Sequence, residues 1–198
     1  MKLKKENLEG EFVRLEPLNQ SHKEQLCEII QSGELWKIQL TVIPHPDKVE
    51  EYINFANTVF DNDEGLAFAT IDKSSGKVAG TTRFYEADYP NKKVEIGYTF
   101  IGKAWQKSVI NTEAKYLMLS HAFEVLKLNR VELITDLLNL NSKRAILRLG
   151  AKEEGILRAE RIMPDGRIRD TIMFSITYYD WPEIKENLLL KLRKSYSS

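Results

Sequence analysis

The segment Val94-Glu95-Ile96-Gly97-Tyr98-Thr99-Phe100-Ile101 alternates between large apolar side chains and other residues, which is typical of a β-strand with two different faces. After Trp105-Gln106 the chain reaches Asn111-Thr112-Glu113-Ala114-Lys115, where an asparagine suited to an N-cap is followed by an acid in the first turn. Apolar residues then recur at helical spacing. The pattern predicts a strand over 94–101 and a long helix over 111–127.

The regions on both sides of this unit supply further strands and helices. Upstream, the pattern predicts a strand at 12–18, helices at 21–31 and 47–60, and strands at 66–71 and 78–86. Downstream, it predicts a strand at 131–135, a short helix from Asn139 to Gly150, two strands around the turn Met163-Pro164-Asp165-Gly166, and a last helix at about 181–194. This order indicates an α/β (α+β) fold with one mixed, mostly antiparallel sheet of about seven strands flanked by helices. No repeat or linker divides the chain, so we expect a single domain over 1–198.

Composition limits the classes of function. The 198 residues hold 29 lysines and arginines and 29 aspartates and glutamates, and this zero net charge argues against binding of nucleic acid or an anionic membrane. No apolar run reaches the roughly 18 residues of a membrane helix. The single cysteine, Cys27, excludes an internal disulfide and fits a cytoplasmic protein. The histidines have no metal-ligand spacing, so we expect no metal. The oligomeric state stays open, a homodimer included.

Two segments carry a resemblance to a known family. The first runs from Val94 through Gln106 to Lys115, and the second is Asn139-Leu140-Asn141-Ser142-Lys143-Arg144-Ala145-Ile146 through Leu149-Gly150-Ala151. Together they resemble the GNAT superfamily of N-acetyltransferases, and within it the Rim-type branch that acetylates ribosomal-protein N-termini. The resemblance implies a GNAT fold, in which the sheet splays between the strands at 94–101 and 131–135. It also implies acetyl-CoA as co-substrate and an amine acceptor, a protein or peptide N-terminus or a small amine, that attacks the thioester directly in a ternary complex.

The same resemblance assigns residues to acetyl-CoA. Where the sheet splays, the free backbone of one strand can pair with the pantetheine arm. The start of the long helix, with free N–H groups and a positive dipole end, suits the pyrophosphate. The implied contacts come from the strand end, Thr99, Phe100 and Ile101; from the loop and first turn, Gln106, Lys107, Ser108, Val109, Ile110, Asn111 and Thr112; and from the next helix, Asn139 and Ser142.

The phosphate loop departs from the family pattern Gln/Arg-x-x-Gly-x-Gly/Ala. Val109 and Asn111 stand at the two small-residue positions, and a valine adopts a positive φ only with strain. Either the loop keeps the family shape with Val109 strained, or the first helical turn tightens and Val109 keeps a negative φ. We expect the second, because aligned N–H groups bind anions without glycine.

Two residues are candidates for the proton transfers. Glu95, near the splay, is the candidate base, and Gly97 beside it is where a bulge costs little. The alternative for Glu95 is a solvated glutamate paired with an arginine or lysine. Many family members have a tyrosine near Ile146 that reprotonates the CoA thiolate. Its absence here leaves Ser142 as the candidate acid, unless this serine only supports the helix cap.

Glu113 lies close to the expected phosphate site, where its charge would repel the ligand. We therefore expect its side chain to point away from that site and to pair with a nearby cation. The candidate partners are Lys115, Lys143 and Arg144.

The departures from the family pattern leave two rival functions. One is a non-catalytic acyl-CoA-binding module with a degenerate phosphate loop, and the other is an interaction module without a CoA site. The acceptor pocket of the fold is formed by the first two helices and the late hairpin. These segments carry no chemical signature, so the sequence does not identify the acceptor.

Overall fold

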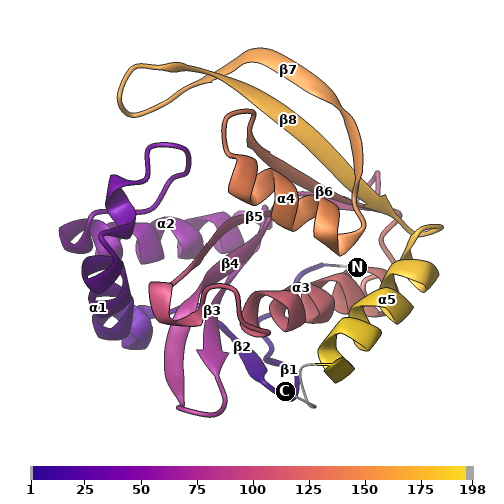
Figure 1. Cartoon of the computed structure of the whole chain (residues 1–198), viewed down its shortest axis with the longest axis horizontal. Helices are drawn as coiled ribbons and strands as arrows, with labels where there is room; N and C mark the ends of the chain where they lie inside the picture. Colours follow the sequence, from indigo (N-terminus) through magenta and orange to yellow (C-terminus); the bar gives the residue numbers. More distant parts are fainter. Residues whose placement is uncertain (1, 195–198) are drawn as a thin grey trace.

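The computed structural model describes residues 2–194, through which one eight-stranded sheet runs in the order β1-β2-β3-β4-β5-β6-β8-β7 (Figure 1). The strands are β1 (Leu8–Glu9), β2 (Val13–Pro17), β3 (Leu66–Asp72), β4 (Lys77–Asp88), β5 (Lys93–Ile101), β6 (Arg130–Asp136), β7 (Lys152–Ile162) and β8 (Ile168–Thr177). Every neighbouring pair is antiparallel except β5 and β6, which are parallel. The predicted mixed, mostly antiparallel α/β fold is confirmed. The strand beyond the expected seven is the two-residue β1, which pairs with β2.

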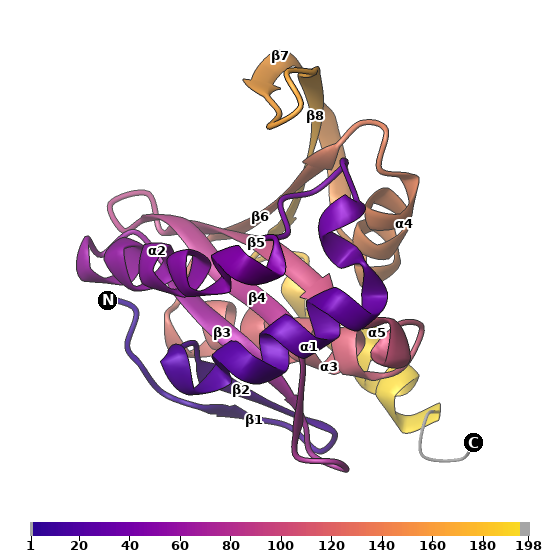
Figure 2. The same cartoon turned by 90° about the vertical axis from the view of Figure 1, so that its left-hand side faces the viewer.

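Helices cover both faces of this sheet. They are α1 (Lys23–Gly33), α2 (Val49–Asp61), α3 (Ile110–Ser120), α4 (Leu140–Leu149) and α5 (Trp181–Lys194). Helices α1 and α2 lie on one face, and α3 and α5 lie on the other (Figure 2). The central strand β3 packs against both layers: Leu66 and Phe68 join the cluster around α3, whereas Ala67 and Ala69 join the cluster around α1 and α2. Its burial on both faces agrees with its continuous apolar sequence.

Strands β5 and β6 separate after a short stretch of pairing. The parallel register holds at three residue pairs, which are Lys93 with Arg130, Val94 with Val131, and Glu95 with Glu132. Beyond them, residues 96–101 of β5 have no partner on β6 within the described chain. The predicted splay between these strands is confirmed, and it opens the sheet near its centre.

The start of α3 differs from the expectation. Asn111 is not the N-cap; Val109 takes that position, and the Ser108 hydroxyl accepts a hydrogen bond from the N–H of Ile110 at 3.3 Å. This hydroxyl supplies the acceptor that we expected from Asn111, so the helix begins earlier. Asn111 lies in the first turn instead, with its side-chain oxygen buried and without a hydrogen-bond partner among residues 2–194.

Helix α3 is also shorter than the predicted helix over 111–127. After Ser120 it widens into a π-helical turn over His121–Val125, in which the N–H of Leu126 donates to the carbonyl of His121 at 2.9 Å. A π turn places one extra residue in the helix, so apolar spacing alone does not reveal it.

Glu113 points away from the start of α3, but the expected pairing with Lys115, Lys143 or Arg144 is wrong. The carboxylate is buried against the beginning of β2 and accepts three backbone hydrogen bonds. The donors are the N–H groups of Glu11, Phe12 and Val13, at 2.9, 2.7 and 2.6 Å. Glu113 therefore ties α3 to the N-terminal segment, whose backbone N–H groups satisfy its charge without a cation.

Candidate active site

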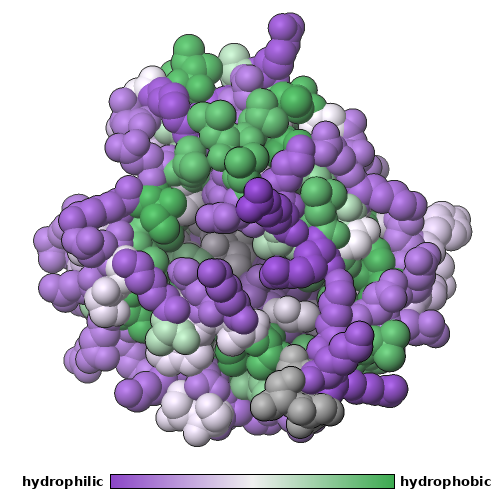
Figure 3. All heavy atoms as spheres, viewed as in Figure 1, coloured by the Kyte–Doolittle hydropathy of each residue, from purple (hydrophilic) through white to green (hydrophobic). Residues whose placement is uncertain are grey.

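A cavity of about 590 Å³ lies in the gap between β5 and β6. Its walls are the separated ends of these strands, the segment 35–43 after α1, the loop before α3, one side of α4, and two arginines of the β7–β8 hairpin. In the view of Figure 3, apolar residues gather above the centre of the molecule, over the hairpin and α4. The predicted site residues that line the cavity are Glu95, Thr99, Phe100, Ile101, Gln106, Lys107, Ser108, Asn111, Asn139 and Ser142. Val109 and Ile110 line an adjacent hollow, and Thr112 lines neither.

Glu95 is the last residue of β5 that pairs with β6, so its carboxyl lies at the point where the strands part. The side chain is buried, with the residue 6% exposed, and it forms no ion pair within residues 2–194. Burial, reinforced by the charge of Glu86, raises the pKa of Glu95 to about 8, although Arg161 and Arg169 act in the opposite direction. The alternative of a solvated, paired glutamate is wrong. A carboxyl with this pKa can exchange a proton near neutral pH.

The bulge in β5 lies one residue beyond the glycine that was expected to favour it. The register with β4 shifts between the pairs Arg83–Gly97 and Thr81–Phe100, and Tyr98 takes the left-handed conformation at φ 49°. The ring of Tyr98 packs on the guanidinium of Arg83 at 4.4 Å, a contact that offsets part of the backbone strain. Gly97 serves another purpose, because a Cβ there would collide with the Glu95 carboxyl.

The loop before α3 avoids strain at Val109. This residue has φ −68° and ψ −22°, as in the second of the two alternatives, and Lys107 takes the positive φ of 60° instead. Gln106 donates its side-chain amide to the carbonyl of Ile101 at 2.9 Å and so connects the loop to the end of β5. The N–H groups of Asn111 and Thr112 have no acceptor among residues 2–194 and remain available to an anion.

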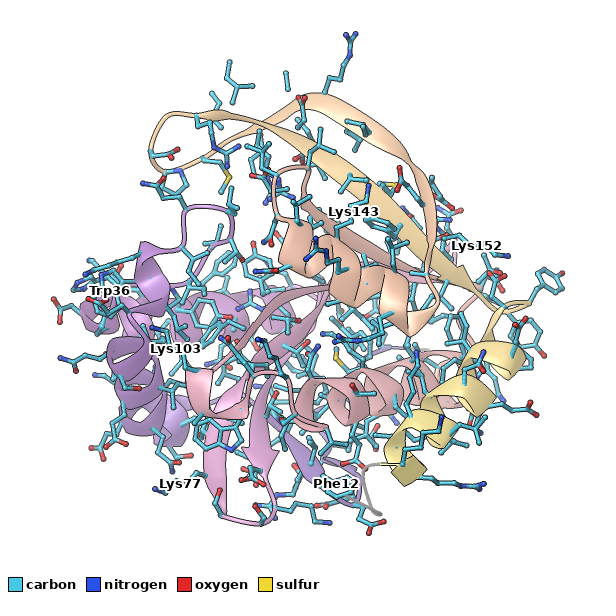
Figure 4. The ribbon with its side chains drawn as sticks, viewed as in Figure 1. Phe12, Trp36, Lys77, Lys103, Lys143 and Lys152 are labelled. Carbon is cyan, nitrogen blue, oxygen red and sulfur yellow. The ribbon has the colours of Figure 1, made fainter. Side chains whose placement is uncertain are left out.

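Asn139 and Ser142 meet at the start of α4. Asn139 is the N-cap as predicted, and its side-chain oxygen accepts the N–H of Ser142 at 3.0 Å. Both residues are half-buried and line the cavity. Farther along the same helix, Arg144 and Arg148 also line it, so this wall combines a neutral cap with two positive charges. Lys143 is directed elsewhere and pairs with Glu153 at 3.1 Å (Figure 4).

Sequence reasoning missed Lys115, a buried lysine in the cavity wall. Its ammonium donates to the hydroxyls of Thr82 and Thr99 at 2.7 and 2.6 Å, and no carboxylate among residues 2–194 pairs with it. Burial lowers the pKa of Lys115 to about 7. A signal existed in the sequence, because Lys115 shares its helical stripe with the apolar Met118 and Ala122.

The aromatic residues Trp36 and Tyr52, from the segments around α1 and α2, have mainly packing contacts. Trp36 lies at the margin of the molecule in Figure 4, with its ring against His45 at a centroid distance of 5.5 Å. Tyr52 is a buried residue of α2, and its hydroxyl lies 3.1 Å from that of Thr81. On the cavity side, Tyr98 is the aromatic residue that β5 supplies between Glu95 and Thr99.

Over residues 2–194, no group of three or more histidine, cysteine, aspartate or glutamate side chains could hold a metal ion. In the same part of the chain, no helix combines the length and the apolar character needed to span a bilayer.

Comparison with protein families identifies the fold. The profile of the acetyltransferase (GNAT) domain family matches residues 13–152. A GCN5-related N-acetyltransferase from Brucella melitensis is 33% identical to this chain, and its crystal structure superposes with a TM-score of 0.86 over 96% of this chain and 86% of its own. The microcin C7 self-immunity acetyltransferase MccE, solved in complex with acetyl-CoA and AMP, shares the fold at 21% identity, with a TM-score of 0.75 over 85% of this chain and 93% of MccE.

Curated sequences lead to the same family. The Bacillus subtilis protein named "Putative ribosomal N-acetyltransferase YdaF" is 32% identical over 106 residues, which are 54% of this chain. The match spans 57% of the length of YdaF. This similarity agrees with the resemblance to the Rim-type branch. The separated strands, the anion-ready start of α3 and the family match lead to one conclusion: this chain belongs to the GNAT family of acetyl-CoA-dependent N-acetyltransferases.

Proposed function

We propose that this chain transfers the acetyl group of acetyl-CoA to a primary amine, a peptide or protein N-terminus or a small amine, by direct attack in a ternary complex. The observation that carries the proposal is the buried Glu95 carboxyl at the point where β5 and β6 part. We assign this activity to one domain over 1–198, since one sheet runs through the described residues, and we place it in the cytoplasm, which the single cysteine favours.

Acetyl-CoA is bound along the gap. The unpaired backbone of Thr99, Phe100 and Ile101 takes the pantetheine arm, and the segment 106–112 takes the pyrophosphate. Lys107, Arg144 and Arg148 add positive charge on the same side of the cavity. Asn139 and Ser142 lie at the thioester end. MccE, solved with acetyl-CoA, supports this donor through the shared fold.

In the reaction, the amine nitrogen attacks the thioester carbon, the new N–C bond forms and the C–S bond breaks. Glu95 takes a proton from the nitrogen, and Ser142 or a water returns a proton to the sulfur. Backbone N–H groups at the Tyr98 bulge polarise the carbonyl. The pKa of Glu95, about 8, lies close to that of an α-amine, so the ionised carboxylate can take the proton of the attacking nitrogen, and activity rises with pH as Glu95 ionises.

An α-amine is the preferred acceptor over a lysine side chain. An α-amino group has a pKa of about 8 and lysine one of about 10.4, a difference of roughly 3 kcal/mol in deprotonation at neutral pH. The similarity to YdaF, whose name refers to ribosomal N-acetylation, favours a protein N-terminus among the α-amines.

The rival function is a non-catalytic acyl-CoA-binding module, and the valine in the phosphate loop is the observation in its favour. The relaxed backbone of Val109 weakens that argument, since the loop needs no glycine to keep its shape.

An acceptor screen separates these functions. The acceptors are peptides with a free N-terminus and either an acidic or a neutral first residue, N-blocked peptides with one internal lysine, and small amines. Release of free CoA is the readout, and calorimetry reports acetyl-CoA binding independently. We expect the free N-termini to react faster than the lysines. Faster acetylation of lysine would refute the preference, and binding of acetyl-CoA without turnover of any amine would favour the rival.

A further inference from the structure

Two arginines face each other across the β7–β8 hairpin at the wall of the cavity. Arg161 on β7 is the direct cross-strand partner of Arg169 on β8, and both line the cavity that holds Glu95. Like charges directly opposite each other in an antiparallel pair repel and destabilise the hairpin. An anion bound between the two guanidinium groups would relieve this repulsion.

Arg169 lacks such an anion within the protein. The residue is 6% exposed, its Nε is buried without a hydrogen-bond partner, and no ion pair to it exists within residues 2–194. A buried guanidinium without a partner is costly, and the cost is recovered when a carboxylate binds it. Arg169 is therefore positioned to bind an anionic group of a ligand.

The nearby carboxylates Asp136 and Glu160 form no ion pair with Arg169 within residues 2–194; their ion-pair partners are Arg167 and Arg161. Asp136 is bonded to the guanidinium of Arg167, and it also accepts the N–H of Leu138 at 2.9 Å. Glu160 lies 3.5 Å from Arg161 and accepts the hydroxyl of Thr171 at 2.8 Å.

Glu95 does not serve as this anion either. Its raised pKa, about 8, keeps the carboxyl mostly protonated at pH 7. The pair of arginines thus keeps a positive charge that faces the cavity at neutral pH.

The position of the pair argues against a phosphate of CoA as the ligand. The cations suited to those phosphates, Lys107, Arg144 and Arg148, come from the loop before α3 and from α4. Arg161 and Arg169 come from the hairpin instead, and their charges act on Glu95. An anion between them lies near the group proposed to deprotonate the acceptor.

We propose that Arg161 and Arg169 bind a carboxylate of the acceptor, so that the amine substrate is acidic: a free amino acid, or a peptide whose first residue is aspartate or glutamate. This proposal rests on the proposed function and narrows its substrate class. A planar guanidinium holds a carboxylate through two parallel hydrogen bonds, which fixes the position of the amine as well as the affinity.

Matched acceptors test the proposal. The first pair is a peptide that begins with aspartate and the same peptide that begins with asparagine, and the second is a free amino acid and its amide. We expect kcat/KM to be about tenfold to hundredfold higher for the acidic member, the range that a hydrogen bond to a charged group contributes. Comparison of the two pairs identifies whether a side-chain carboxylate or an α-carboxylate is the ligand. Equal rates within both pairs, with active enzyme, would overturn the proposal and leave the acetyltransferase function intact.

Variants tie this preference to the two arginines. Arg161→Gln, at a half-exposed position, and Arg169→Gln should each remove most of the preference. The readout is the ratio of kcat/KM between the acidic and the neutral member, because loss of either positive charge also raises the pKa of Glu95 and slows the reaction with both members. Arg158→Gln is the control, since Arg158 is an exposed arginine of the same strand outside the cavity lining. A preference that survives Arg161→Gln as fully as it survives Arg158→Gln contradicts the assignment, even if Arg169→Gln does not fold.

A binding measurement keeps the test independent of turnover. With CoA present, calorimetry compares the α-amide of N-acetylaspartate with the α-amide of N-acetylasparagine, and N-acetylglycine with its amide, as product-like ligands of the wild type. We expect the carboxylate member of at least one pair to bind at least about tenfold more tightly, and Arg161→Gln to remove the difference. Equal binding within both pairs overturns the proposal even if no amine turns over. No turnover with tight carboxylate binding would overturn the proposed function alone.

Discussion

Two regions on opposite sides of α3 treat a buried charge in different ways. Towards β2, Glu113 is 4% exposed and its carboxylate accepts three backbone N–H groups. Towards the cavity, Lys115 is 5% exposed, and its ammonium meets two hydroxyls and no carboxylate within residues 2–194. The first charge is compensated by fixed dipoles, whereas the second is not and its pKa falls to about 7.

This difference distinguishes a buried charge that stabilises the fold from buried ionisable groups that belong to the candidate site. Glu95, Lys115 and Arg169 all line the cavity, and each is an ionisable group that forms no ion pair within residues 2–194. Perturbed ionisable groups concentrate at functional sites because their chemistry requires it. Glu113, whose carboxylate accepts three hydrogen bonds, instead joins α3 to the chain at the start of β2, away from the cavity.

The largest expected effect comes from Glu95→Gln. Removal of a general base lowers turnover by about 10²–10⁴-fold, while acetyl-CoA affinity should stay within a few-fold. In the wild type, kcat/KM should rise with pH through about 8 as Glu95 loses its proton, and the variant should lack this limb. Rates are measured from pH 6 to 9.5 with an acceptor whose amine pKa lies well below 7, so that the amine does not titrate. A variant within a few-fold of wild type across this range would show that another group is the base.

Glu113→Ala should act on stability. It removes the carboxylate that accepts three backbone hydrogen bonds, one of them, from Val13, fully buried, and we expect a loss of about 3 kcal/mol in the free energy of unfolding. Denaturant titration measures this loss. Turnover per folded molecule, measured below the unfolding transition, should stay near that of the wild type. If chemistry fails while the free energy of unfolding is unchanged, the contrast between the two sides of α3 is wrong.

Lys115→Met should change how stability depends on pH. In the wild type, the unfolded lysine keeps its proton up to pH 10.5, whereas the folded one loses it above about 7. The unfolded state therefore binds more protons in this window, and Lys115 makes stability rise with pH by up to about 1.4 kcal/mol per unit. Glu95 contributes a fall between 4.5 and about 8, so the comparison is made as the difference between variant and wild type. The free energy of unfolding is measured for both proteins at pH 7, 8, 9 and 10. If the difference between the two proteins is the same at every pH, Lys115 is not neutral in the folded state.

The smallest effect is expected from Val109→Gly. The valine already has an ordinary backbone conformation, so glycine relieves no strain. Acetyl-CoA affinity should change by less than about tenfold, or about 1.4 kcal/mol. Calorimetric titration of both proteins measures it. Absent binding in the wild type, with tight binding restored by glycine, would support the non-catalytic rival.

The sequence predicted those features that depend on neighbouring residues. The alternation over 94–101 identified β5, and Asn139 identified the start of α4, because periodicity and capping are local. The splay followed from the family resemblance. The features that the sequence did not reveal depend on contacts between residues far apart in the chain. The partners of Glu113 lie about one hundred residues away from it. Tyr98 has a positive φ, and the guanidinium of Arg83 packs against its ring. The start of α3 was misplaced because a serine hydroxyl replaced the expected asparagine cap.

The three-pair junction of β5 and β6 has a mechanical consequence. The sheet has two parts, β1 to β5 and β6 to β8. The backbone pairing that joins them is confined to residues 93–95 of β5 and 130–132 of β6, at one end of the boundary between the parts. A ligand bound between the separated ends of β5 and β6 would contact both parts of the sheet and hold them together where backbone hydrogen bonds do not. Glu95 lies where the paired part of the two strands ends. We therefore expect binding of the co-substrate to restrict the motion of the proposed base as well.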